Sequence, residues 1–246
     1  MAPLASNHTL LFYDQRGTGN STLAADSAEL AADKFATDLE AVRQHFHLRT
    51  LAILGHSWGA IVAALYAARY PARVKRLIIV AGVPLTHVEM AKAVSEREGR
   101  RDSTSRAELK RWYEARVADP GDTAACRAYF RIWFTPFFAD TSARHRSKGD
   151  FCAGTPGSRR NKIEHVDKYT FASLGNWDLH SGLSRLEAPT LVIQGTADVF
   201  PQSTGEEWAS APRHGKLVTL PNAGHFPYLE LPDAFFAIVD EFLKQP

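Results

Sequence analysis

The sequence predicts an α/β fold, in which a mainly parallel sheet is covered by helices on both faces. Short apolar segments, such as 73–81, alternate with amphipathic segments, such as 33–45, in the first part of the chain and again near its end. The run from Leu77 to Val80 is apolar throughout, which is typical of a strand buried in a parallel sheet. A Gly-x-Ser-x-Gly pentapeptide at 55–59 stands between a strand pattern and a helix pattern.

Length and composition are those of an ordinary globular protein. The 246 residues suffice for one domain, or one domain with an insertion, and 45% are hydrophobic. The net charge of +2 does not suggest a nucleic-acid partner, and no apolar run reaches the ~18 residues that a membrane span needs. The N-terminus has neither the charged nor the apolar part of a signal peptide. We therefore expect no nucleic-acid partner, no membrane segment and a cytoplasmic location.

Cysteine usage and motif content give no sign of a cofactor. Cys126 and Cys152 do not make a disulfide framework, and so few cysteines fit a reducing cytoplasm. No His/Cys spacing fits zinc, and no Gly-rich phosphate loop follows a strand. We expect neither a metal nor a cofactor.

The chain is predicted to consist of an α/β core with an inserted helical cap. Residues 84–186 contain helical patterns, charge and aromatics but no convincing buried strand, so we assign 1–83 and 187–246 to the core and 84–186 to the cap. The elements expected in chain order are strands at 8–13, 50–54, 73–81, 189–195 and 216–220, core helices at 33–45, 60–66, 203–210 and 232–244, and cap helices near 86–98, 105–118, 122–139 and 161–174, with an exposed loop at 144–162.

The pentapeptide has the features of a nucleophile elbow. Ser57 would occupy a strained turn that pushes its hydroxyl outward, and Gly55 and Gly59 would be glycine because a side chain would collide with the adjacent strand or helix. The N-terminus of the following helix, including the backbone N–H of Trp58, would face negative charge that forms on a substrate oxygen.

Two further residues at strand ends complete a predicted catalytic triad. Asp198 and His225 each follow a predicted strand, and the loops after parallel strands open on one edge of the sheet. Alone, a histidine after a strand is more often structural, and an aspartate in a Gly-x-x-Asp turn is usually only a turn residue. Together with Ser57 and in this order, they predict a serine nucleophile, a histidine base and an orienting aspartate.

These motifs resemble the α/β-hydrolase superfamily, and most closely the proline iminopeptidase-like capped serine hydrolases. The resemblance rests on the loop 13–21 with its Asp-Gln-Arg-Gly sequence, on the elbow with its Trp58, and on Asp198, His225 and Glu230. It implies cofactor-free hydrolysis of small N-terminal peptides or amino-acid amides. Esterases and cofactor-free haloperoxidases carry similar loops, so a carboxylesterase acting on small esters is the alternative.

The resemblance is incomplete at the N-terminus. The family has an opening hairpin, a third strand and a His-Gly-Gly-Pro-Gly-type loop that supplies an oxyanion-hole N–H, and no residues here match them. We expect an N-terminally truncated form, or else a short natural variant that pairs its sheet edge with another chain. Losing one oxyanion donor costs ~10²–10³ in turnover, so a catalytically impaired ligand-binding protein is a further alternative.

Residues of the cap and the histidine loop are candidates for substrate binding. The resemblance implies that carboxylates of the cap hold the free amine of the substrate. Glu164, Asp167 and Asp178 are the candidates for this role, and the alternative is that all three are solvated surface charges. Aromatic residues form either the cap's own core or an apolar substrate pocket over Ser57. The predicted pocket residues are Trp133, Phe134, Phe137, Trp177 and Phe226.

Overall fold

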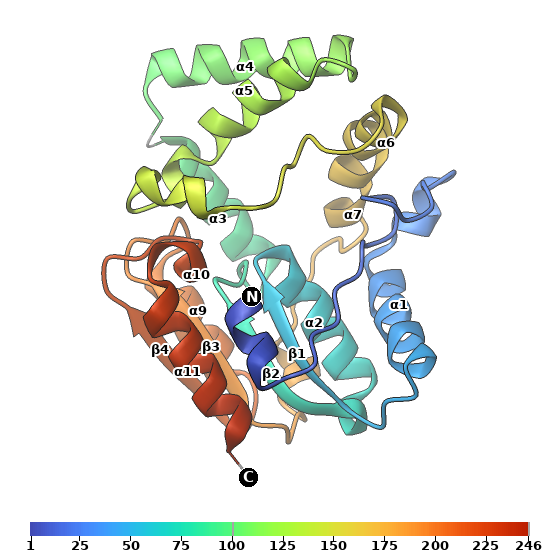
Figure 1. Cartoon of the computed structure of the whole chain (residues 1–246), viewed down its shortest axis with the longest axis vertical. Helices are drawn as coiled ribbons and strands as arrows, with labels where there is room; N and C mark the ends of the chain where they lie inside the picture. The colour runs from blue at the N-terminus through green and yellow to red at the C-terminus, as the bar shows by residue number, and fades with distance from the viewer. Residues whose placement is uncertain (100, 246) are drawn as a thin grey trace.

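The computed structural model describes residues 1–99 and 101–245, and it contains the α/β fold that the sequence predicts (Figure 1). Four parallel strands form one sheet in the order β1-β2-β3-β4. The strands are β1 (Leu51–His56), β2 (Val74–Val80), β3 (Thr190–Gly195) and β4 (Gly215–Leu220). Each lies within about two residues of a strand predicted from the sequence.

Helices cover both faces of the sheet because successive strand residues point to opposite sides. On β2, Leu77 and Ile79 pack toward one helical layer, whereas Ile78 and Val80 pack toward the other. The first layer contains α1 (Ala32–His45), α2 (Trp58–Arg69), α8 (His180–Leu183) and α9 (Gln202–Ser210), and the second contains α11 (Pro232–Lys244) and the short 3₁₀ helix η1 (Ala2–Ser6).

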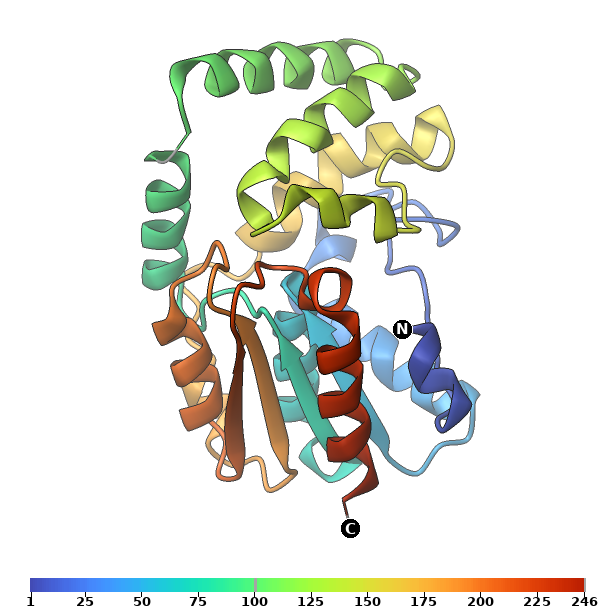
Figure 2. The ribbon, with the colours of Figure 1, turned by 60° about the vertical axis from the view of Figure 1, so that its left-hand side comes forward.

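Between β2 and β3 the described chain has helices but no strand, and most of it lies beyond the carboxyl ends of the strands (Figure 2). Besides α8, the helices between these strands are α3 (His87–Gly99), α4 (Ser103–Ala118), α5 (Thr123–Trp133), η4 (Thr135–Phe137), η5 (Thr141–Arg146), α6 (Pro156–Asn161), the π-helical turn η6 (Lys162–Val166) and α7 (Asp167–Ala172). A bridge between Thr86 and Asp178 joins the two ends of this insertion. The division into core and cap at 84 and 186 stays a prediction.

The remaining elements are short: η2 (Ser27–Leu30), η3 (Pro71–Arg73) and α10 (Pro227–Glu230). The helix predicted for 122–139 ends at Trp133 and gives way to η4, where Pro136 lacks the N–H that would continue an α-helix. Within the described ranges, no helix is both long and apolar enough to cross a membrane.

The strand predicted for 8–13 is wrong, since these residues run without regular structure. A strand needs a neighbour for its backbone groups, and a cavity of about 680 Å³ lies between this segment, β1, α1 and α2. In the part of the chain that the structure describes, β1 pairs with β2 only, so its other edge is open. Phe12 is accordingly 75% exposed.

The expectation that the two cysteines give no disulfide framework is also wrong, since they are bonded to each other. Cys126 on α5 is bonded to Cys152 in the loop before α6, and both residues are buried. Sequence reasoning missed the bond because the two cysteines are 26 residues apart, and only the fold of the insertion brings them together. The neighbouring Phe151 packs against Phe130 and Phe134. The disulfide thus fixes this loop to the aromatic side of α5.

Reduction of the disulfide is expected to destabilise the insertion by about 3 kcal/mol, because it removes a cross-link that restricts the unfolded chain. Urea unfolding with and without dithiothreitol measures this difference. The Cys126→Ser/Cys152→Ser variant is the control, since its unfolding should be the same in both conditions. Two titratable thiols in the denatured, unreduced protein would contradict the prediction.

Candidate active site

The nucleophile elbow has the geometry that the pentapeptide predicts. Ser57 follows β1 and precedes α2, with a left-handed backbone at φ 55° and ψ −120°. A Cβ on Gly55 would lie 2.4 Å from the carbonyl oxygen of Gly59, so glycine is required there. The expectation for Gly59 is wrong, because a Cβ there would meet no atom within 4 Å apart from its chain neighbours and the backbone of its own helix. Gly59 lines the 680 Å³ cavity instead of packing against a strand.

Asp198 and His225 lie together at the carboxyl edge of the sheet. The Nδ1–H of His225 donates to Oδ1 of Asp198 at 2.9 Å, and the two side chains are at most 1% exposed. The backbone N–H of Phe200 also donates to this oxygen, at 3.2 Å. Since a carboxylate only accepts, the proton of a neutral His225 resides on Nδ1, and Nε2 is left as an acceptor.

The acceptor atom of His225 is available for a further proton. In residues 1–99 and 101–245, its Nε2 is buried without a hydrogen-bond partner, and no bond joins it to the Ser57 hydroxyl. The elbow and the histidine loop nevertheless touch, because the rings of His56 and His225 lie 4.9 Å apart. Hydrogen bonds of a catalytic serine are often long or absent in an enzyme without substrate.

His56 is a contact that sequence reasoning missed. Its Nε2–H donates to the carbonyl oxygen of His225 at 2.8 Å, so it ties the elbow to the histidine loop. Burial, and then repulsion from a protonated His225, lowers the pKa of His56 to about 3. His56 is therefore neutral at ordinary pH. Its position directly before Ser57 was the only sequence signal.

Trp58 places its backbone N–H at the first position of α2, where the helix itself offers no acceptor. Its indole Nε1–H donates to Oε1 of Gln15 at 3.2 Å, and its ring lies 5.7 Å from Phe35 and 4.7 Å from Phe171. The side chain thus joins the Asp-Gln-Arg-Gly loop to helix α7. The backbone N–H stays a predicted oxyanion donor.

Four of the five predicted pocket residues form one aromatic cluster beside His225. Phe137 and Phe226 lie 5.1 and 5.4 Å from the His225 ring. Phe134 packs on Phe226 at 5.7 Å, and Trp133 packs on Phe137 at 6.3 Å. Trp177 lies elsewhere: it contacts Phe171 and His87, and its Nε1–H donates to the Pro84 carbonyl.

The three acidic residues considered for amine binding have partners within the protein. Glu164 pairs with Arg160, Asp167 pairs with Arg116 and Lys162, and the exposed Asp178 caps the N–H of His180. Each carboxylate therefore already has a donor or a cation beside it.

Glu230 holds the histidine loop against the insertion. One carboxylate oxygen accepts from the backbone N–H of Gly224, and the other accepts from Ala139 and Asp140. The backbone N–H of His225 donates to the Phe137 carbonyl at 2.8 Å. Sequence reasoning included Glu230 in a motif but assigned it no role. No group of three His, Cys, Asp or Glu side chains in the described ranges could hold a metal.

Residues 1–232 match the model of the alpha/beta hydrolase fold family. The chain therefore belongs to the α/β-hydrolase fold family, and it is a hydrolase enzyme.

Its relatives place it near one group within that family. The proline iminopeptidase of Heyndrickxia coagulans is 26% identical in an alignment of 250 positions, which covers 98% of this chain and 83% of that protein. Among solved structures, the alpha/beta hydrolase MGS-M2 from a Medee basin deep-sea metagenome library covers 100% of this chain and 84% of its own, with a TM-score of 0.72 and 22% identity. An esterase from Exiguobacterium antarcticum covers 94% of this chain and 80% of its own, with a TM-score of 0.63 and 19% identity. The chain thus resembles proline iminopeptidases in sequence, whereas the two solved structures show the fold alone.

Proposed function

We propose that the chain is a serine hydrolase that acts by acyl transfer through Ser57, His225 and Asp198, on small N-terminal peptides or amino-acid amides. The observation that carries the proposal is the buried 2.9 Å hydrogen bond from His225 Nδ1 to Asp198, which leaves Nε2 as an acceptor at the sheet edge where Ser57 stands. The likeness to proline iminopeptidases supports the choice of substrate.

In the proposed reaction, His225 Nε2 takes the Ser57 proton while the serine oxygen bonds to the substrate carbonyl carbon. The Trp58 N–H donates to the resulting oxyanion. As the oxyanion collapses, the bond to the leaving group breaks, and His225 returns the proton to that group. Water then attacks the acyl-serine with His225 as base, which releases the carboxylic acid and restores Ser57.

A fluorophosphonate probe tests the nucleophile. The folded protein is expected to be labelled at Ser57, and Ser57→Ala should abolish labelling and lower turnover by at least about 10⁴-fold. The exposed Ser210→Ala is the matched control and should behave as wild type. A folded protein that leaves Ser57 unlabelled would sink the proposal. Ligand-induced thermal stabilisation without turnover would favour the ligand-binding alternative.

The second candidate function is a carboxylesterase acting on small esters. The specific observation in its favour is that each acidic residue considered for amine binding already has a partner: Glu164 and Asp167 form ion pairs, and Asp178 accepts from the backbone N–H of His180. Comparison of kcat/KM for proline 4-nitroanilide and 4-nitrophenyl butyrate separates the two substrate classes.

A small molecule or short peptide is the proposed partner, and the absence of a nucleic-acid partner stays a prediction. The cytoplasmic location also stays a prediction, but the Cys126–Cys152 disulfide weighs against it, because such bonds persist mainly in oxidising compartments.

A further inference from the structure

A buried arginine on helix α3 has donor groups without acceptors. Arg97 is only 7% exposed. Its Nε–H donates to Oε1 of Glu98 at 2.8 Å, but in residues 1–99 and 101–245 no acceptor faces its two terminal nitrogens. These nitrogens are not among the fully buried, unpartnered side-chain atoms of the described residues, so they reach the solvent. Because a charged group that is mostly removed from water needs matching partners, they are suited to an anion that comes from outside the chain.

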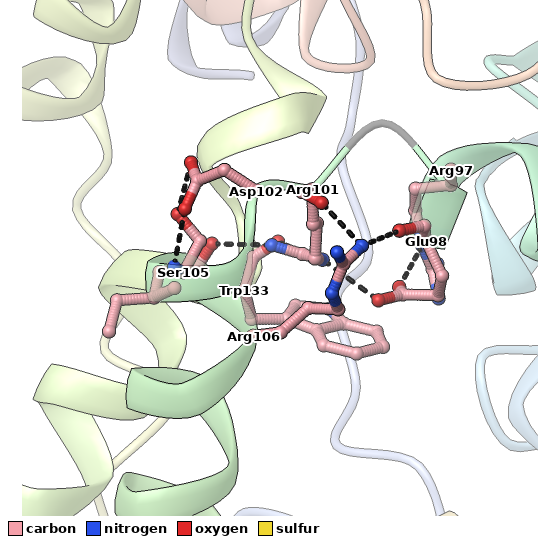
Figure 3. A network of polar contacts seen from close by, with 8 residues as sticks. Arg97, Glu98, Arg101, Asp102, Ser105, Arg106 and Trp133 are labelled. Atoms are coloured by element: carbon pink, nitrogen blue, oxygen red, sulfur yellow. Dashed lines mark hydrogen bonds and ion pairs between the residues drawn. The ribbon is translucent and has the colours of Figure 1, made fainter.

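The surroundings of Arg97 carry excess positive charge (Figure 3). Glu98 also accepts from Arg101 Nε at 2.9 Å, so one carboxylate serves two buried guanidinium groups. Arg106 adds a third cation, which donates to the backbone carbonyls of Glu98 and Arg101. The nearby Asp102 is engaged as the cap of helix α4, where it accepts from Ser105.

Arg101 differs from Arg97 in having its remaining donors satisfied. Its terminal nitrogens donate to the carbonyls of Ile132 and Trp133 at the end of α5, at 3.2 and 3.0 Å. These carbonyls are the negative end of a helix and suit a cation. Arg101 is therefore structural, and the unmatched donor capacity belongs to Arg97.

Arg97 lies on the aromatic cluster beside the candidate catalytic histidine. Its guanidinium carbon is 4.5 Å from the Trp133 ring centre and 5.6 Å from that of Phe137, whose ring in turn contacts His225. One turn earlier on α3, Ala93 packs into the same cluster as Phe137 and Phe226. Through the Phe137 ring, Arg97 is thus joined by direct contacts to the histidine that is proposed to serve Ser57.

We propose that Arg97 binds a carboxylate of the substrate, which makes the enzyme selective for small esters or amides with an anionic group away from the scissile bond. This inference rests on the proposed function and narrows its substrate class. The planar guanidinium group suits a carboxylate because it donates two parallel hydrogen bonds. Arg97 contributes to binding and takes no part in proton transfer.

Two substrate pairs test the proposal and locate the carboxylate. On the acyl side, 4-nitrophenyl hydrogen glutarate is compared with 4-nitrophenyl valerate. On the leaving-group side, prolylglycine is compared with prolylglycinamide. In at least one pair the wild-type enzyme is expected to favour the anionic member by about 10–100-fold in kcat/KM, mainly through KM, since hydrogen bonds to charged groups contribute about 1.5–3 kcal/mol.

The Arg97→Met variant is expected to bring this ratio close to one, while Arg97→Lys retains part of it. Methionine keeps an apolar side chain over Trp133. The matched control is Arg111→Met, since Arg111 also stacks on a tryptophan, Trp112 at 4.6 Å, but is exposed on α4. The control should keep the wild-type ratio.

A wild-type ratio near one for both pairs overturns the inference, and so does an Arg97→Met variant that loses activity equally on both members. If Ser57 is unlabelled and no substrate is turned over, the proposed function fails separately. Binding then decides the carboxylate site: monomethyl glutarate at millimolar concentration should raise the Tm of Ser57→Ala but not that of Ser57→Ala/Arg97→Met. Equal shifts in the two variants would refute the site.

Discussion

Replacing Asp198 with asparagine is expected to lower kcat by about 10⁴-fold while the protein stays folded. The carboxylate fixes the proton of His225 on Nδ1 and stabilises the imidazolium that forms when Nε2 takes the Ser57 proton. In the described chain, the second carboxylate oxygen of Asp198 is buried without a hydrogen-bond partner. An asparagine that keeps its oxygen toward His225 and Phe200 would place its NH₂ group at this position, where it would be buried without an acceptor. An asparagine turned the other way would move the histidine proton to Nε2 and remove the base.

The measurement is kcat on the best substrate, with thermal unfolding to show that the variant is folded. Asp178→Asn is the matched control, because Asp178 is exposed and bonds to the backbone N–H and the ring of another histidine, His180. It should leave kcat unchanged. Wild-type turnover by a folded Asp198→Asn variant would show that Asp198 is structural and that the proposed triad is wrong.

The sheet could be predicted from the sequence because its signals are local. Each strand from β1 to β4 is a short apolar run, and each core helix carries its own apolar stripe. Strand ends also located the site residues. In a parallel sheet the loops that hold Asp198 and His225 both follow the carboxyl ends of strands, so the contact between these residues could be expected from the sequence alone.

Features that depend on distant neighbours could not be predicted in this way. Residues 8–13 have a strand-like sequence, but the structure offers them no paired strand. The Cys126–Cys152 bond depends on how the insertion folds back on itself. The unmatched donors of Arg97 also arise only from tertiary packing, since nothing in its local sequence distinguishes it from the arginines around it.

The two elbow glycines are expected to respond oppositely to alanine. A Cβ at Gly55 would lie 2.4 Å from the oxygen and 2.7 Å from the carbonyl carbon of Gly59, and backbone atoms in the first turn of α2 cannot move aside as a side chain can. We expect Gly55→Ala to cost about 3 kcal/mol or more. A loss of this size lowers the Tm of a protein of this length by roughly 10 °C. It is also a large part of a total stability of about 5–15 kcal/mol.

Gly59→Ala is the matched comparison, since it adds the same methyl group four residues later. Beyond its chain neighbours and the backbone of its own helix, no heavy atom lies within 4 Å of the added carbon, and Gly59 is the second residue of α2. Alanine is favoured over glycine in a helix by up to about 1 kcal/mol, so the Tm should stay the same or rise by a few degrees. Thermal unfolding of both variants measures the contrast. Equal losses would mean that the space beside Gly59 is filled in solution, because only a close neighbour could make alanine as unfavourable there as at Gly55.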